Sequence, residues 1–198
     1  TEGLLLEGNY IYGNGVVNSY LEHNVYLQTM GVTVQYNWLG DTRQGSLGGN
    51  LKDRSAGTVI RYNKIEGGAR LIDLVEAQEH TQAATADPRY RASFVYGNIL
   101  VAPPQDAGFL VHYGGDSGIF ENYRKGKLYF NHNTVYLVSN KPEQWARAVL
   151  DISTNDETVY FDNNVVMLEG DTYLRLNREA GKVIMGKNWM EQGWEDGW

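Results

Sequence analysis

The sequence predicts an all-β protein, a parallel β-helix of about seven coils, and three observations lead to that fold class. One frame of apolar residues around an asparagine recurs seven times along the 198 residues. A second short apolar stretch follows the frame from coil to coil. With 23 glycines and no cysteine, the chain is rich in turn-forming residues and has no disulfides. A repeat this short cannot bury its own apolar face, so it must stack on its neighbours.

The frame reads apolar-x-apolar-x-x-Asn-x-aliphatic. Its asparagines are Asn9, Asn37, Asn63, Asn98, Asn133, Asn164 and Asn188. The residues three positions earlier are Leu6, Val34, Ile60, Val95, Phe130, Phe161 and Met185. The residues two positions later are Ile11, Leu39, Ile65, Leu100, Val135, Val166 and Met190. Both columns are apolar in all seven copies, so we expect each to form a stack in the interior.

Each coil is expected to begin with a strand, because apolar residues alternate before the asparagine. The asparagine then occupies a bend, where it tolerates a left-handed backbone and its amide can bond to the next asparagine in a ladder. The second strands are expected at 24–27, 50–53, 71–74, 110–113, 149–152 and 173–176. With an interstrand spacing of about 4.8 Å, seven coils would make a stack of roughly 30–35 Å.

Three insertions lengthen the repeat, at 75–92, 114–126 and 139–148, the last with a helical turn expected near Pro142. We expect the insertions on one edge of the solenoid, where they would border a binding face. Residues 1–198 are expected to form one domain, a fragment or processed part of a longer chain.

The coil length, the bend asparagine and the short strands resemble the right-handed parallel β-helix proteins of the pectate-lyase-like superfamily, over essentially the whole chain. Residues 50–63 are similar to the lysine-bearing coil of the chondroitinase B and alginate lyase group. In that group a catalytic lysine is followed by serine and, nine residues after the lysine, by the bend asparagine. Here the residue nine before Asn63 is Arg54, not Lys52.

Two further positions depart from the pattern of that group. Its acidic calcium ligands would fall near Leu47 and Gly49, and its downstream catalytic arginine near Val75. The resemblance therefore implies the right-handed fold and a secreted bacterial protein, extracellular or periplasmic, but not the full catalytic set. A shared fold does not imply shared chemistry.

Composition limits the partners. The net charge of −7 argues against nucleic acid or an anionic membrane as the main partner. The longest apolar run is only a few residues, so no transmembrane helix is expected.

At the chain ends, Leu4-Leu5-Leu6 begins the first coil almost at once. We therefore expect the N-terminal coil to be covered by missing upstream sequence or by another copy in a head-to-tail contact.

The candidate site follows from the second strands, whose middle residues should point out of the core. These residues are Tyr26, Lys52, Asp73, His112, Asp151 and Arg175, with Arg54 two positions after Lys52. Cleavage of a uronic-acid polymer by β-elimination needs a cation for the carboxylate, a base for the C5 proton and an acid for the leaving oxygen. Lys52 or Arg54 suits the first task. Tyr26, Lys52 or His112 suits the second.

A simpler interpretation is also open, since outward residues of a solenoid are polar and neighbouring charges pair at the surface without any chemistry. His23 has inward parity and is expected to be a buried, hydrogen-bonded histidine. The turns 153–157 and 162–164 are rich in oxygen ligands, so Ca²⁺ is a possible cofactor there, although ordinary turns have this composition too.

Two function classes stay open. One is a carbohydrate-active enzyme, a polysaccharide lyase acting on an acidic, uronate-containing glycan. The other is a non-catalytic β-helix module, such as an adhesin, a tailspike-like protein or a filament-forming protein. Convergence of Tyr26, Lys52, Arg54, Asp73 and His112 in one groove would favour the enzyme.

Overall fold

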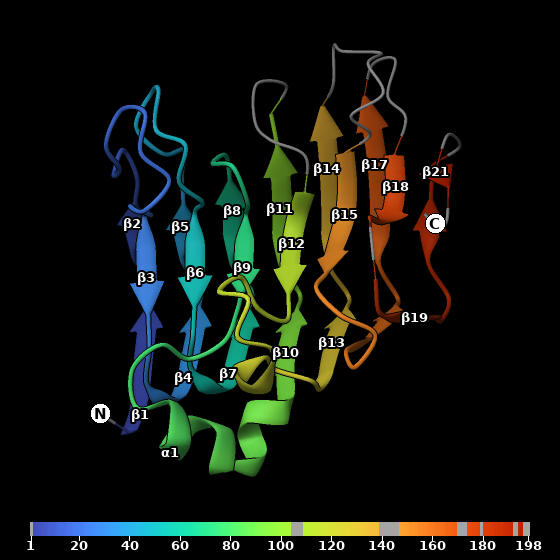
Figure 1. The fold of residues 1–198 in the computed structure, drawn as a ribbon. Helices are drawn as coiled ribbons and strands as arrows, with labels where there is room; N and C mark the ends of the chain where they lie inside the picture. Colours follow the sequence, from blue (N-terminus) through green and yellow to red (C-terminus); the bar gives the residue numbers. More distant parts are fainter. Residues whose placement is uncertain are drawn as a thin grey trace.

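The computed structural model describes residues 2–103, 109–138, 147–169, 174–178, 180–191 and 194–195. They form a right-handed parallel β-helix, whose strands lie side by side from coil to coil (Figure 1). Three sheets of seven parallel strands run the length of the solenoid. The predicted fold class and number of coils are confirmed.

The first sheet, sheet 1, carries the strand that precedes each ladder asparagine. It consists of β1 (Glu2–Glu7), β4 (Met30–Gln35), β7 (Ala56–Arg61), β10 (Ala92–Tyr96), β13 (Lys127–Asn131), β16 (Thr158–Asp162) and β19 (Lys182–Met185). Sheet 2 follows the asparagine bend. It consists of β2 (Tyr10–Ile11), β5 (Trp38–Leu39), β8 (Lys64–Glu66), β11 (Ile99–Ala102), β14 (Thr134–Val138), β17 (Val165–Glu169) and β20 (Trp189–Met190).

Sheet 3 completes each coil and corresponds to the second strands expected from the sequence. It consists of β3 (Val25–Leu27), β6 (Leu51–Asp53), β9 (Ile72–Leu74), β12 (Phe109–Tyr113), β15 (Arg147–Ile152), β18 (Leu174–Asn177) and β21 (Trp194–Glu195). The short helices of the described residues are α1 (Thr81–Ala86) and the 3-10 turns η1 (Pro88–Arg91) and η2 (Phe120–Asn122).

Both apolar columns lie in register, as predicted, the first in sheet 1 and the second in sheet 2. In sheet 1, Ile60, Val95, Phe130 and Phe161 are fully buried, and the rings of Phe130 and Phe161 stack with centroids 5.2 Å apart. Only the end coils are open, where Met185 is 39% exposed. Burial of these columns supplies the main driving force for stacking the coils.

The asparagine ladder is confirmed along all seven copies. Each side-chain amide donates to the carbonyl oxygen of the next asparagine side chain, at 3.0 Å from Asn63 to Asn98 and 3.3 Å from Asn133 to Asn164. The predicted left-handed position was wrong by one residue. The preceding residue takes the positive φ, for example 55° at Tyr62, and this leaves the asparagine to bond in both directions.

The insertions 75–92 and 114–126 occupy the same corner, between sheet 3 and sheet 1, and they contact each other. The hydroxyl of Tyr90 donates to the Asn122 carbonyl at 2.8 Å, and Arg91 donates to the Tyr123 carbonyl at 2.8 Å. The third insertion, 139–148, joins sheet 2 to sheet 3, and the helical turn expected there lies outside the described residues.

Candidate functional site

The predicted outward column lies on the outer face of sheet 3. Tyr26, Lys52, Asp73, His112 and Asp151 are paired from strand to strand in this order. The prediction for the sixth residue of the column was wrong, because Arg175 pairs with Ala148 rather than with Asp151. The position beside Asp151 belongs to Arg178, whose Nη1 lies 3.8 Å from Asp151 Oδ2.

Lying outside the core does not leave these side chains in solvent. Lys52 is only 7% exposed, because the loop at 114–118 folds over it. Its Nζ lies 2.9 Å from Asp73 Oδ2 and 2.5 Å from Asp116 Oδ2. Lys52 therefore bridges two carboxylates that come from a neighbouring strand and from an insertion.

Arg54 extends the same network toward the surface. Its Nη2 lies 3.1 Å from Asp116 Oδ1, and its Nη1 donates to the Glu76 carbonyl at 2.6 Å. Its Nε donates to the hydroxyl oxygen of Tyr26 at 2.7 Å, and that hydroxyl donates to Gln78 Oε1 at 3.1 Å. Tyr26 is 47% exposed, so it is the end of the network that solvent and ligands can reach.

His112 forms the buried end of the network. Its Nδ1 donates to Asp73 Oδ1 at 2.6 Å, and its Nε2 is hydrogen-bonded to Ser153 Oγ at 3.0 Å. Both ring nitrogens are thus engaged with protein groups, and the side chain is 6% exposed. With this geometry, His112 is better suited to position the Asp73 carboxylate than to contact a ligand directly.

Two carboxylates of the network, Asp73 and Asp116, have lowered pKa values. Burial alone would raise the pKa of Asp73, but the His112 hydrogen bond and the charges of His112, Arg70 and Lys52 hold it far below its usual range. Burial would likewise raise the pKa of Asp116, but its hydrogen bond to Lys52 and the charges of Lys52 and Arg54 lower it. Neither group is a carboxylic acid near neutral pH.

A pocket of about 410 Å³ opens above the network. Its floor includes Lys52, Asp73 and Asp116. The remaining lining residues are Tyr20, Leu21, His23, Leu47, Gly49, Ala69, Arg70 and Phe109. Apolar and aromatic walls over a charged floor are typical of sites that bind small polar ligands.

His23 belongs to this pocket rather than to the core. Its Nδ1 accepts a hydrogen bond from the Gly49 amide at 3.0 Å, so the predicted hydrogen bonding is confirmed, but the ring is only partly buried. Burial, with the charge of Lys52, lowers its pKa. The imidazole is therefore neutral at neutral pH.

Sequence reasoning missed three residues of the network, Arg70, Glu76 and Asp116. It also missed a separate buried ion pair between Arg124 and Asp53. Arg124 is completely buried, and its Nη2 lies 3.3 Å from Asp53 Oδ2. It also donates to the carbonyls of Val75, Ser55 and Asp53 at 2.9–3.1 Å. A signal was present in the sequence. The residues five positions before each asparagine point into the core and are aliphatic in every coil except two, where they are Thr58 and Ser93. Thr58 donates a hydrogen bond to Asp53, and Ser93 accepts one from Arg124.

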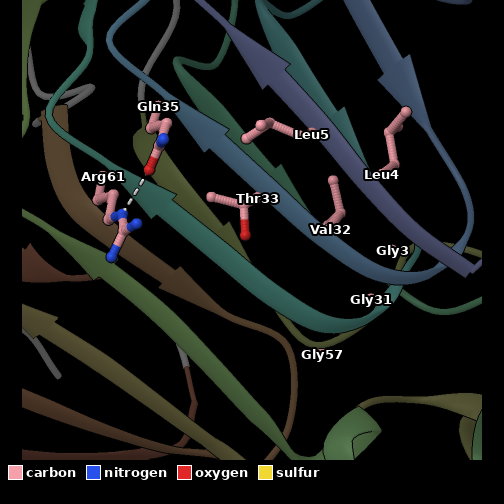
Figure 2. A pocket seen from close by; sticks show the side chains of 9 residues that line it. All are labelled: Gly3, Leu4, Leu5, Gly31, Val32, Thr33, Gln35, Gly57 and Arg61. Atoms are coloured by element: carbon pink, nitrogen blue, oxygen red, sulfur yellow. Dashed lines mark hydrogen bonds between the residues drawn. The ribbon is translucent and has the colours of Figure 1, made fainter.

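A second hollow of about 410 Å³ lies on the outer face of sheet 1 (Figure 2). Gly3, Gly31 and Gly57 stack along one side, and Arg61 donates to Gln35 Oε1 at 2.7 Å on the other. The side chain of Arg89 fills the space that a β-carbon on Gly57 would need, with its Cβ 3.3 Å away. Gly31 and Gly57 thus leave room for Arg89 of the η1 turn on the sheet.

The turns considered for Ca²⁺ have protein partners. Glu157 is fully buried and accepts hydrogen bonds from the amides of Thr154 and Lys125 at 2.9 and 3.1 Å. Asp162 accepts from the Lys187 amide at 2.6 Å. Among the described residues, no group of three or more His, Asp or Glu side chains is placed to hold a metal ion.

Comparisons with protein-family models, curated proteins and solved structures give no match. In the part of the chain that the structure covers, no helix is long and apolar enough to cross a membrane. The class of protein defined so far is a parallel β-helix with a charged network and a pocket on the outer face of sheet 3.

Proposed function

We propose that the chain acts on an acidic, uronate-containing glycan as a polysaccharide lyase, at the outer face of sheet 3, and that it is a distant member of the pectate-lyase-like superfamily. One observation carries the proposal. Tyr26, Lys52, Arg54, Asp73 and His112 are joined through Asp116 and direct contacts into one network beside a single pocket. Strongly coupled titratable groups beside a pocket are typical of functional sites.

The ionised carboxylates favour this chemistry over glycoside hydrolysis. A glycosidase needs one carboxyl group protonated near neutral pH, so that it can donate its proton to the leaving oxygen. The low pKa values of Asp73 and Asp116 oppose that role. Proton transfer by a phenol, an imidazole or an amine is what elimination requires of this site.

In the proposed reaction, the phenolate of Tyr26 takes the C5 proton of a uronate sugar. The electron pair left on C5 forms the C4–C5 double bond and the C4–O bond breaks. The leaving oxygen then takes the proton that Tyr26 has gained, which restores the phenolate. Arg54 donates to the Tyr26 oxygen and would stabilise negative charge on it. Lys52 and Arg54 supply positive charge beneath the sugar carboxylate, and Asp73 and His112 hold Lys52 in place.

One observation favours the non-catalytic module instead. The cations of the network are already paired with Asp73, Asp116 and Glu76, as they would be if they only fixed the insertion loops to the coils. In that case the face would bind a glycan without cleaving it.

The test is release of unsaturated uronate, followed by its ultraviolet absorbance, from alginate, chondroitin and pectin. Tyr26→Phe keeps the ring and should lower the rate about 100-fold or more, the usual contribution of a proton-transfer group. Tyr62→Phe, an exposed tyrosine on another corner, is the matched control. Full activity in Tyr26→Phe would remove Tyr26 from the mechanism. Absence of product from all three polymers with the unaltered chain would leave the binding module.

A further inference from the structure

The proposed elimination leaves one reactive group of sheet 3 unused, the hydroxyl of Ser153, directly after β15. Its Oγ lies 3.0 Å from His112 Nε2, and His112 Nδ1 donates to Asp73 Oδ1 at 2.6 Å. The three residues come from neighbouring coils, since His112 pairs with Asp73 on one side and with Asp151, two residues before Ser153, on the other. A serine, a histidine and an aspartate joined in this order form the triad of serine hydrolases, which recurs on unrelated folds and is recognised by its geometry.

The Asp73 carboxylate decides which nitrogen of His112 carries a proton. An ionised carboxylate only accepts hydrogen bonds, so the contact at 2.6 Å places a proton on Nδ1. A neutral ring protonated there has its lone pair on Nε2, which faces Ser153 Oγ. Nε2 is thus placed to take the hydroxyl proton as a general base. The lowered pKa of Asp73 keeps this carboxylate charged, and its charge stabilises the imidazolium that forms.

Ser153 is the residue of the triad that solvent reaches. Asp73 and His112 are 2% and 5% exposed, whereas Ser153 is partly exposed. The Gly114-Gly115 turn passes beside the hydroxyl, and the Gly115 amide donates to Ser153 Oγ at 2.9 Å. A β-carbon on Gly114 would lie 2.6 Å from this oxygen, so the close approach requires glycine. The Gly115 amide supplies a donor for the negative charge that develops beside Oγ during acyl transfer.

The same turn limits the size of the group that can reach the hydroxyl. The carbonyl oxygens of Tyr113 and Gly115 lie 3.2 and 2.9 Å from Ser153 Oγ and occupy part of the space around it. A small acyl group such as acetyl therefore fits better than a long one. Because both carbonyls can accept the hydroxyl proton, the O–H bond must turn from them to His112 Nε2 when the serine reacts.

We propose that Ser153, His112 and Asp73 hydrolyse esters of small carboxylic acids, acetyl esters above all. Ser153 Oγ bonds to the acyl carbon, its proton passes to His112 Nε2, and the ester C–O bond breaks as the alcohol oxygen takes that proton. Water then attacks the acyl-serine and gives one proton to Nε2. The C–O bond to the serine breaks, Oγ regains its proton from Nε2, and the carboxylic acid leaves.

The test is labelling of the unaltered chain with a fluorophosphonate, which reacts with activated serines, followed by peptide mapping in a mass spectrometer. We expect the label on Ser153. We also expect acetate to be released from p-nitrophenyl acetate and from acetylated xylan, an uncharged glycan that keeps this reaction distinct from elimination, and p-nitrophenyl octanoate to react more slowly. Ser153→Ala should lower the rates about 100-fold or more. Ser117→Ala, at an exposed serine of the same insertion, is the matched control and should keep full activity.

Ser153 also helps to hold the Gly114-Gly115 turn, so circular dichroism and the melting temperature are measured for every variant. If Ser153→Ala fails to fold, the position of the label in the unaltered chain decides. His112→Gln should prevent labelling although the serine remains, which a purely structural role of Ser153 does not predict.

No label on Ser153 with excess reagent, or undiminished ester hydrolysis in Ser153→Ala, would overturn the inference and leave the three residues as a tie between the turn and the coils. The outcome is separate from that of the proposed elimination. A labelled Ser153 with acetate release but no unsaturated uronate would keep the triad and refute the lyase. Unsaturated uronate without a label would do the reverse.

Discussion

Replacement of Arg124 tests whether the buried charges hold the insertion corner to the coils. Arg124→Met removes a guanidinium that is 0% exposed and leaves the Asp53 carboxylate without its charge partner. Three backbone carbonyls also lose a donor, those of Val75, Ser55 and Asp53. Removal of one partner of a buried ion pair costs about 3–5 kcal/mol, since the remaining charge is left uncompensated.

That loss should be visible as a large shift in melting temperature. For a chain of this size, about 1 kcal/mol corresponds to roughly 2–4 °C, so Arg124→Met should lower the melting temperature by roughly 6–20 °C. The assay is thermal and urea unfolding followed by circular dichroism. Arg43→Ala, at an exposed position, is the control and should change stability by less than about 0.5 kcal/mol.

A double variant makes the test specific to the pair. Asp53→Asn in the Arg124→Met background removes the stranded charge, although Asn must still serve the amide of Ser55 and the hydroxyl of Thr58. The two losses should be less than additive, by about 0.5–3 kcal/mol. Strict additivity, or a loss below about 1 kcal/mol for Arg124→Met, would refute the reasoning.

Two other predictions concern the ladder and acid stability. Asn98→Ala removes a side-chain amide that donates to the Ile60 carbonyl and to Asn133 and accepts from Asn63. The free energy of unfolding, measured with urea, should therefore fall by at least about 1–3 kcal/mol. An unchanged urea midpoint would contradict the role of the ladder. The pKa values of Asp73 and Asp116 are lowered in the folded chain. These two carboxylates therefore stabilise the folded state at neutral pH. That stabilisation is lost as the pH falls below about 4, where the carboxyl groups of the unfolded chain take up protons. Melting temperatures measured from pH 7 to 3 should fall in that window, and a flat profile would exclude the network as a source of stability.

The fold could be predicted because the frame is anchored in every coil by the same asparagine. Register in sheet 1 and sheet 2 follows from counting residues on either side of that anchor, which is why Phe130 and Phe161 were placed correctly. Sheet 3 lies after segments of variable length, and no residue fixes its register. The position of Arg175 was therefore wrong by three residues, and Arg178 takes its predicted place beside Asp151.

The candidate site could be predicted only as a column of outward residues. Periodicity gives the direction of Lys52 and His112 from the core, but it cannot show that a loop covers them. Asp116 reaches the network, and Arg124 reaches Asp53, from an insertion whose path depends on its own contacts. Examples are the hydrogen bonds from the Asp116 and Ser117 amides to Glu76 at 2.9 and 2.7 Å. Such contacts leave no repeat in the sequence.

The central claim is that the outer face of sheet 3 receives an acidic glycan. The most direct measurement is a crystal structure of the Tyr26→Phe variant with an acidic tetrasaccharide. We expect density for the sugar in the pocket lined by Lys52, Arg70 and Asp73, with a sugar ring beside position 26. Density confined to the glycine-lined hollow of sheet 1 would contradict the claim, as would a chain that shows no bound sugar at saturating concentration.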